Sequence, residues 1–216
     1  MKFKAAALCV MFGLGTVGAP CAARECWFGL TVGASVPASD MLTASEDDLA
    51  FNEVASSGWD LGGTATFRMS RILGLGLDAG YHSWPGSDFL NSNISQNSFA
   101  PGGGPVVAEG HWSALQATGH GQVYIPTSGR VRPYFQIGAG MYMVTLSYAT
   151  DVAGDGSSKK ARLGYNGGIG ANVIANDKMA VGLSGLYHYI PRKDEFYGNY
   201  TAFTVQVSLL WKSAGE

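Results

Sequence analysis

Hydrophobic and polar positions alternate along most of this chain with a period of two. Over stretches of about ten residues, apolar side chains occupy every second position, and small or polar side chains stand between them. Within Leu73–Trp84, for example, Leu75 and Leu77 alternate with Gly76 and Asp78. This period predicts β-strands with one apolar face and one face of different character.

Eight such stretches follow one another, and we expect a strand in each. Their ranges are Trp27–Pro37, Gly58–Met69, Leu73–Trp84, Trp112–Ile125, Tyr134–Tyr148, Arg162–Ala175, Met179–Ile190 and Tyr200–Trp211. Beyond the N-terminal segment the chain has no run of about 18 apolar residues, so it predicts no transmembrane helix. The expected fold class is therefore all-β.

The connections between these stretches alternate in length. Three of them are short, namely Ser70–Ile72, Pro126–Pro133 and Asn176–Lys178. The connections after the first, third, fifth and seventh stretches are longer, and the second of these covers Pro85–His111. Short turns at one end and long loops at the other are typical of outer-membrane barrels. We therefore expect an eight-stranded antiparallel up-and-down transmembrane β-barrel with its long loops outside the cell.

Aromatic residues gather near both ends of the expected strands. One end collects Trp27, Phe28, Phe67, Tyr124, Phe135 and Trp211. The other end collects Trp59, Tyr81, Trp84, Trp112, Tyr148, Tyr165, Tyr187, Tyr189 and Tyr200. Because two aromatic girdles flank the apolar band of a membrane-spanning barrel, we expect these side chains at the two interfaces.

The alternative is a soluble all-β domain with its apolar face inward. Such a domain needs a charged exterior, yet only 14 % of this chain is Asp, Glu, Lys or Arg. Many of the 31 glycines stand on the face opposite the apolar residues, where a soluble core would need large side chains. Composition thus favours the membrane barrel.

The N-terminus has the features of a secretory signal peptide. Lys2 and Lys4 precede the apolar stretch Ala5–Val17, and small residues lead to Ala23, where we expect cleavage. The expected organisation is a signal peptide over residues 1–23, a barrel over residues 24–211 and a short tail over residues 212–216. Cleavage removes two lysines and leaves 12 basic against 16 acidic residues, a balance that does not favour nucleic acid.

The three cysteines bear on the same segment. Cleavage would remove Cys9 and Cys21 and leave Cys26 alone, so we expect neither an intrachain disulfide nor a cysteine metal site. A lipoprotein anchor at Cys21 is the alternative to cleavage after Ala23, but Pro20 fits it poorly.

Polar residues on the other strand face predict a packed polar interior. They are Asp60, Arg68, Asp78, His82, Gln116, His120, Gln136, Asn166, Asn172, His188 and Gln206. An eight-stranded barrel is just wide enough for side chains to fill it, and buried polar groups need partners. The short turns predict the pairs Asp60 with His82, Thr64 with Asp78 and Asn166 with His188. We expect no metal site, no cofactor and no wide pore.

The candidate catalytic pair is His111 and Ser113. By the alternation of their strand, both face lipid near the outer leaflet, an arrangement similar to that of membrane lipid A deacylases. A hydrolase triad also needs an acid to orient the imidazole, and the neighbouring stretch Tyr134–Tyr148 contains neither Asp nor Glu. We therefore expect no catalytic residues and no enzyme, with a lipid A-modifying enzyme as an alternative.

Three segments resemble a known family: Arg132–Gly140, Gly167–Ala171 and Asn176–Leu183. Together they are similar to the outer-membrane β-barrel-domain family, which includes OmpA-like and OmpX-like eight-stranded barrels. The resemblance covers the whole expected barrel and implies insertion by the barrel-assembly machinery. One departure is that Lys212–Glu216 follows Trp211, whereas such barrels usually end in an aromatic residue.

The loops are where recognition is expected. The first long loop contains Asp40, Glu46, Asp47, Asp48 and Glu53, an acidic set that fits a solvated loop better than a site for divalent ions or for a basic partner surface. We expect a monomer in contact with outer-membrane lipid and lipopolysaccharide. Its expected role is structural or surface interaction, in envelope integrity or adhesion, with a surface ligand bound through the loops. A narrow channel is a further alternative.

Overall fold

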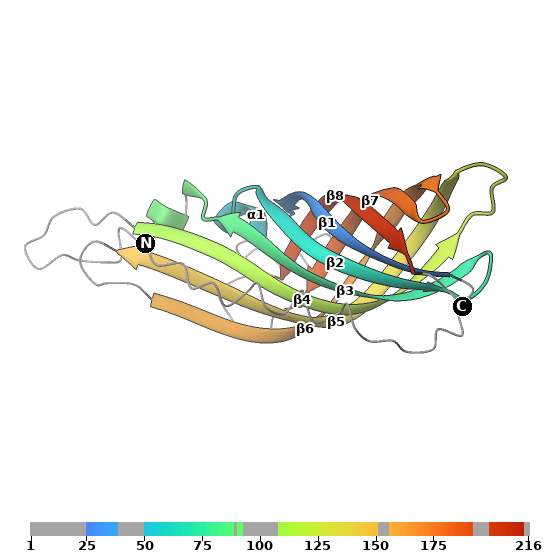
Figure 1. Cartoon of the computed structure of the whole chain (residues 1–216). Coiled ribbons are helices and arrows are strands. Elements are labelled where there is room, and N and C mark those ends of the chain that lie inside the picture. Colours follow the sequence, from blue (N-terminus) through green and yellow to red (C-terminus); the bar gives the residue numbers. More distant parts are fainter. Residues whose placement is uncertain are drawn as a thin grey trace, which may run out of the picture.

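The computed structural model describes residues 25–38, 50–88, 90–92, 108–150, 156–191 and 199–213. Eight antiparallel strands form a closed barrel in chain order, and the first strand pairs with the last (Figure 1). This closure removes free edges from the wall. The eight-stranded up-and-down barrel predicted from the sequence is confirmed.

The strand bounds agree with the alternation, most closely in the shorter strands. The strands are β1 (Glu25–Pro37), β2 (Gly58–Arg68), β3 (Leu73–Pro85), β4 (Ala108–Tyr124), β5 (Val131–Thr150), β6 (Gly156–Asn176), β7 (Met179–Ile190) and β8 (Tyr200–Lys212). A short helix, α1 (Phe51–Val54), lies between β1 and β2. We call the end with the three short connections the turn end and the opposite end the loop end.

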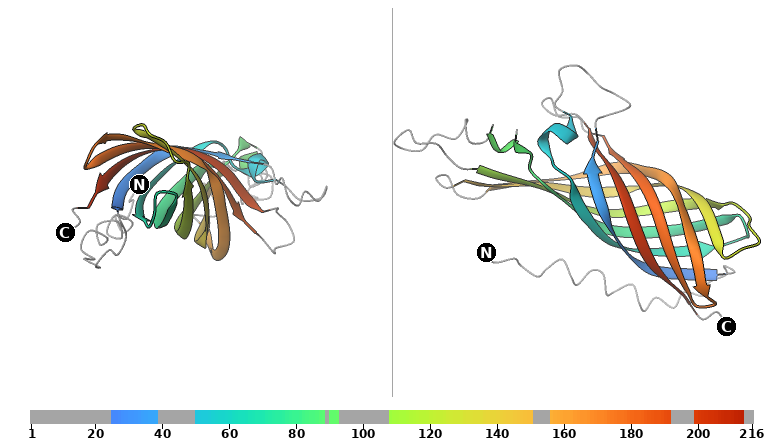
Figure 2. Two further views of the ribbon diagram at one scale, coloured as in Figure 1. Left: turned by 90° about the vertical axis from the view of Figure 1, so that its right-hand side faces the viewer. Right: turned by 90° about the horizontal axis from the view of Figure 1, so that it is seen from above.

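The prediction of a long connection after the fifth strand is wrong. Strands β5 and β6 continue as a paired hairpin as far as Tyr148 opposite Gly156, which leaves only residues 151–155 between them. Together with β4, they project past the other strands at the loop end (Figures 1 and 2). Ser157, Ser158 and Lys159 are exposed there. In this projecting hairpin, polar residues lie on both faces, so the period of two is lost. The alternation of apolar and polar residues therefore ends before β5 and β6 do.

The apolar faces of the strands point outward. Leu30 and Leu77 are each 56 % exposed, and Ile137 is 74 % exposed. An apolar surface that follows every strand suits lipid rather than water. The register agrees with the predicted pairs, because Asp60 lies opposite His82, Thr64 opposite Asp78, and Asn166 opposite His188.

Part of the predicted aromatic girdles is wrong. Five of the proposed girdle residues are buried inside the barrel: Trp27, Trp84, Trp112, Tyr124 and Tyr200. Each stands an even number of positions from the inward polar residues of its strand and therefore faces the interior. Position near a strand end was thus not enough to assign a residue to a girdle. The outward-facing members include Phe135, Trp59 and Trp211, which are substantially exposed.

Some expectations fall outside the described residues. These are the signal peptide over residues 1–23, most of the acidic loop and the last three residues of the tail. Cys26 is disulfide-bonded in the structure of the full chain, so the expectation of an unpaired Cys26 applies only after residues 1–23 have been cleaved. Within the described residues, no helix has the length and hydropathy required to cross a membrane.

Candidate functional site

The barrel interior divides into an ionic cluster at the turn end, a polar network at mid-height and an aromatic plug at the loop end. The ionic cluster is centred on Glu25. Its Oε2 accepts hydrogen bonds from Arg68 Nη1 at 3.2 Å and Arg132 Nη1 at 3.0 Å. Lys212 Nζ donates to Oε1 at 3.2 Å, and Trp27 Nε1 donates to Oε2 at 3.3 Å. One carboxylate therefore joins the ends of β1, β2, β5 and β8, a role that sequence analysis missed.

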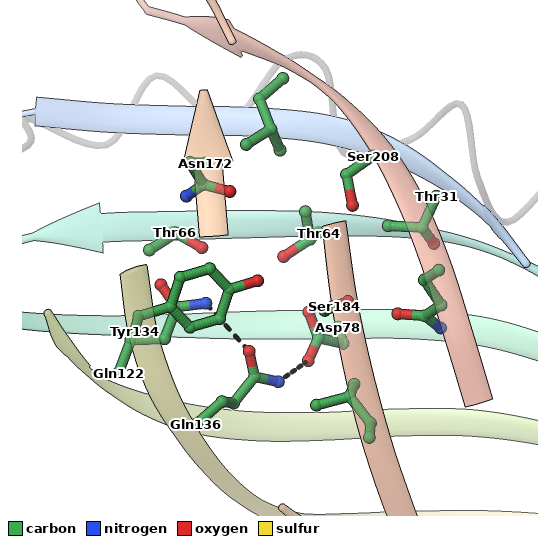
Figure 3. Close-up of a pocket in the computed structure, with 13 residues that line it drawn as sticks. Thr31, Thr64, Thr66, Asp78, Gln122, Tyr134, Gln136, Asn172, Ser184 and Ser208 are labelled. Carbon is green, nitrogen blue, oxygen red and sulfur yellow. Dashed lines mark hydrogen bonds between the residues drawn. The ribbon is translucent and has the colours of Figure 1, made fainter. Parts of the chain in front are cut away.

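At mid-height, a chain of hydrogen bonds runs along the inner wall. His120 Nδ1 lies 2.7 Å from Asp78 Oδ2, and Gln136 Nε2 donates to the same oxygen at 3.2 Å. Gln122 Nε2 in turn donates to Gln136 Oε1 at 2.9 Å (Figure 3). Tyr124 donates to Gln122 Oε1 at 2.5 Å. Asp78, His120 and Gln136 were predicted to fill the barrel as structural polar groups, and here the last two bind the first.

A second set of buried polar contacts lies nearer the loop end. His82 Nε2 is hydrogen-bonded to Gln116 Oε1 at 2.8 Å. His188 is held on both ring nitrogens, by Tyr142 at 3.1 Å and by Thr204 at 3.0 Å. Each imidazole is thereby fixed among neutral partners. Among the described residues, no group of three His, Cys, Asp or Glu side chains is placed to hold a metal ion.

Asp60 is the most buried carboxylate of the described interior, with only 1 % of its surface exposed. Gln206 Nε2 donates to its Oδ2 at 2.7 Å, whereas Oδ1 has no protein partner within the described part of the chain. The polar cavities inside the barrel have volumes of about 40 and 20 Å³. Spaces of this size hold one or two water molecules. Neither of these two cavities is large enough to hold a solute much larger than water.

The loop end is closed by aromatic rings. Helix α1 inserts Phe51 between Trp84, Trp112 and Tyr200, with ring centroids 5.4, 5.8 and 5.4 Å from the phenyl ring. All three contacts are edge-to-face, the geometry that aromatic pairs favour. Trp84 also donates from Nε1 to Ser35 Oγ at 3.0 Å, which fixes its ring across the barrel. The inward parity of the tryptophans was readable in the sequence, but the insertion of Phe51 was not.

The candidate catalytic pair does not form a triad. His111 and Ser113 lie on the outward side of β4, as predicted, but His111 Nε2 is hydrogen-bonded to Ser83 Oγ, at 3.2 Å, rather than to Ser113. Within the described residues, no carboxylate is hydrogen-bonded to the imidazole. The arrangement therefore lacks the acid that a hydrolase triad uses to orient its base.

Comparison with known families agrees with this architecture. The family model described as outer membrane protein beta-barrel domain matches residues 7–212. The chain belongs to the outer membrane protein β-barrel domain family. Its location is the outer membrane, where lipid and lipopolysaccharide surround the apolar outer face. In barrels of this kind the short turns are periplasmic, so the turn end faces the periplasm and the loop end faces the outside. A comparison with curated proteins gives no match.

Solved structures of outer-membrane barrels are similar to this chain at low sequence identity. Neisserial surface protein A is 13 % identical, with a TM-score of 0.54 over 87 % of this chain and 97 % of that chain. Ail of Yersinia pestis, solved in complex with the heparin analogue sucrose octasulfate, is 12 % identical, with a TM-score of 0.47 over 88 % and 99 %. OprG of Pseudomonas aeruginosa is 14 % identical, with a TM-score of 0.45 over 88 % and 94 %. At these identities the similarity concerns the fold alone.

Proposed function

We propose that this protein is a non-enzymatic outer-membrane barrel that acts at the cell surface, in envelope integrity or adhesion. The observation that carries the proposal is the closed interior. Phe51 and its three aromatic neighbours fill the loop end, and the polar network fills the middle. A barrel without a passage presents its outer surfaces to partners, which argues against the narrow channel considered as an alternative.

The projecting part of β4, β5 and β6 supplies a contact surface at the loop end. From Gly156 to Gly164, β6 lies beyond its pairing with β7, which begins at Tyr165 opposite Tyr189. Its residues from Ser157 to Ala161 are exposed. A paired hairpin that carries exposed polar side chains away from the membrane is suited to contact a ligand or a neighbouring cell.

We also propose the simplest organisation of the mature protein. Residues 1–23 are removed as a signal peptide, residues 24–211 form the barrel, and residues 212–216 form a short tail. The protein is inserted by the barrel-assembly machinery and works as a monomer without a cofactor. N-terminal sequencing of the purified protein tests the first point, and mass measurement in detergent tests the oligomeric state.

Attachment of cells that display the barrel tests the proposed surface role. We expect binding to host cells, extracellular matrix or lipopolysaccharide to fall when Ser157–Ala161 is replaced by a glycine and serine segment of equal length. The same replacement of the periplasmic residues Thr127–Gly129 is the control and should leave binding unchanged. Stepwise conductance in planar bilayers, or attachment equal to that of cells without the barrel, would contradict the proposal.

The absence of catalysis is tested separately. We expect the lipid A acylation pattern to be the same for the unmodified protein, for His111→Ala and for Ser113→Ala, because no carboxylate of the described residues is hydrogen-bonded to His111. A change of acylation that depends on both residues would instead establish the lipid A-modifying enzyme.

A further inference from the structure

A cleft opens at the periplasmic rim of the barrel, between the turn that joins β2 to β3 and the turn that joins β4 to β5. Its volume is about 520 Å³, far larger than the cavities of the interior. Ser70 and Arg71 line it from the first turn, and Ser128 and Gly129 from the second. A Cβ atom added to Gly129 would meet nothing within 4 Å, so the mouth of the cleft is open at this turn.

The lining of the cleft is strongly cationic. It includes Arg68, Arg71 and Arg132 against the single carboxylate of Glu25. That carboxylate is already shared by Arg68 and Arg132, and by Lys212 outside the cleft lining. The negative charge is therefore more than neutralised by its own contacts, and the cleft keeps an excess of positive charge.

Arg68 is held in place before any ligand arrives. Its Nη1 donates to Glu25, its Nη2 donates to the carbonyl oxygen of Arg71 at 2.9 Å, and its guanidinium carbon lies 4.8 Å from the centre of the Tyr124 ring. A guanidinium fixed in this way loses little conformational entropy when it binds an anion.

The other two arginines have donors to spare. Among the described residues, the side chain of Arg132 forms one hydrogen bond, from Nη1 to Glu25 at 3.0 Å. Arg71 is exposed, and its hydrogen bond with Arg68 uses its backbone carbonyl rather than its guanidinium. Several N–H groups can thus converge on a ligand with multiple acceptor oxygens.

The cleft also lies at the level of lipid headgroups. Phe67, the residue before Arg68, faces outward, and so does Phe135 of β5, which is 55 % exposed. Outward aromatic residues of barrels lie at the membrane–water interface, where phospholipid phosphates are found. Guanidinium groups bind phosphate through paired, charge-assisted hydrogen bonds.

We propose that this periplasmic cleft is a phosphate-binding site. The phosphate comes either from a phospholipid of the inner leaflet or from a free phosphate in the periplasm. Arg71 and Arg132 contact its oxygens directly, and Arg68 supplies a fixed positive charge at the base of the cleft.

Titration of the full barrel with inorganic phosphate tests the site. The protein is folded in maltoside micelles at constant ionic strength set by chloride, and the amide signals of Ser128 and Gly129 are followed by NMR. We expect saturable shifts, with the affinity reduced about tenfold or more in Arg71→Gln, which removes a charge-assisted contact. Arg130→Gln is the matched control, since it removes the same charge from the other turn of the rim, between β4 and β5, without lining the cleft.

Nanodiscs distinguish the two sources. One set contains phosphatidylcholine alone, and the other contains phosphatidylcholine with phosphatidylglycerol. If the headgroup is the ligand, the two amides respond less to added phosphate in both nanodiscs than in maltoside micelles, which contain no lipid phosphate, and least with the anionic lipid. If free phosphate is the ligand, the response in both nanodiscs equals that in micelles. Equal phosphate affinity in Arg71→Gln and Arg130→Gln, or amides unchanged by phosphate and by the anionic lipid, would overturn the proposal.

Discussion

The carboxylate of Glu25 joins strands that are far apart in the sequence. It binds Arg68, Arg132 and Lys212 at 3.0–3.2 Å, and the side chains of all four residues are largely shielded from water. Three cations so close together repel one another unless a negative charge stands between them. The residue thus closes the barrel electrostatically at the point where β1 meets β8.

Neutralising this residue should destabilise the barrel. For Glu25→Gln we expect the free energy of unfolding in lipid vesicles to fall by about 1–3 kcal/mol, because the three cations lose their counter-charge. Urea titration followed by tryptophan fluorescence measures it. Asp177→Asn, which removes an equal charge from the exposed β6–β7 turn, should change little. A loss of equal size in both variants would show that only net charge matters.

Glycine is required at particular inward positions rather than throughout the barrel. A Cβ atom at Gly140 would collide with the carbonyl oxygen of Ala117 and lie 2.5 Å from Cα of Thr118, both of them backbone atoms of β4. At Gly121, by contrast, the nearest atom would be Leu75 Cδ2 at 4.0 Å, an ordinary contact.

These two glycines should therefore respond differently to substitution. Gly140→Ala should lower the free energy of unfolding by about 1–3 kcal/mol, since backbone atoms cannot move aside as a side chain does. Gly121→Ala should be neutral within about 0.5 kcal/mol. Refolding yield and urea midpoints of the two variants measure the contrast. A Gly140→Ala barrel as stable as the Gly121→Ala barrel would refute the close approach of β4 and β5.

Helix α1 has only four residues and owes its position to the rings that it contacts. Phe51 and Val54 face the barrel and are buried, whereas Asn52 and Glu53 are exposed. So short a helix is not stable in isolation, and burial of Phe51 among three aromatic rings is what holds it.

Removal of the phenyl ring should release the plug without opening a pore. We expect Phe51→Ala to speed proteolysis between β1 and β2 and to shift tryptophan emission to longer wavelength, because Trp84 and Trp112 become hydrated. Asn52→Ala, on the exposed side of α1, should do neither. The barrel should stay electrically silent in planar bilayers, since the polar network beneath remains. Conductance in Phe51→Ala would show instead that α1 alone closes a passage.

In the molecule as a whole, the apolar surface of the barrel faces the lipid and the polar groups lie inside. Val207 of β8 lies midway along the wall, paired with Leu183 of β7, and each is at least half exposed. Val131 begins β5 close to the periplasmic interface. The energetic effect of a charge should therefore depend on depth.

Arginine substitution at these two valines measures how the energetic effect of a charge depends on depth. Val207→Arg should cost about 2–4 kcal/mol of folding free energy, as for a charge near the bilayer midplane, whereas Val131→Arg should cost about 0–1 kcal/mol. Urea unfolding in vesicles, with unheated gel mobility as the check on folding, gives both values. Equal costs would contradict the membrane position assigned to the wall.

The local alternation of apolar and polar residues predicted most of the fold. The period of two in β7 defined its bounds correctly, and the short turns fixed the pairs of Asp60 with His82 and Asn166 with His188. These features depend only on neighbours in sequence and on the geometry of a tight turn, so they could be predicted for each strand and its turn separately. The lengths of β5 and β6 could not be obtained in this way, because backbone pairing continues where the apolar pattern stops.

The sequence by itself therefore determined an eight-stranded barrel, the register of two of its hairpins and the polar character of its interior. Only the tertiary structure decided which side chains meet inside. The insertion of Phe51 between Trp84 and Tyr200, and the contacts of Glu25 with Arg132 and Lys212, join residues that closure of the sheet alone brings together. A periodic pattern records the face on which a residue lies, whereas the partner across the barrel depends on how all eight strands curve and close.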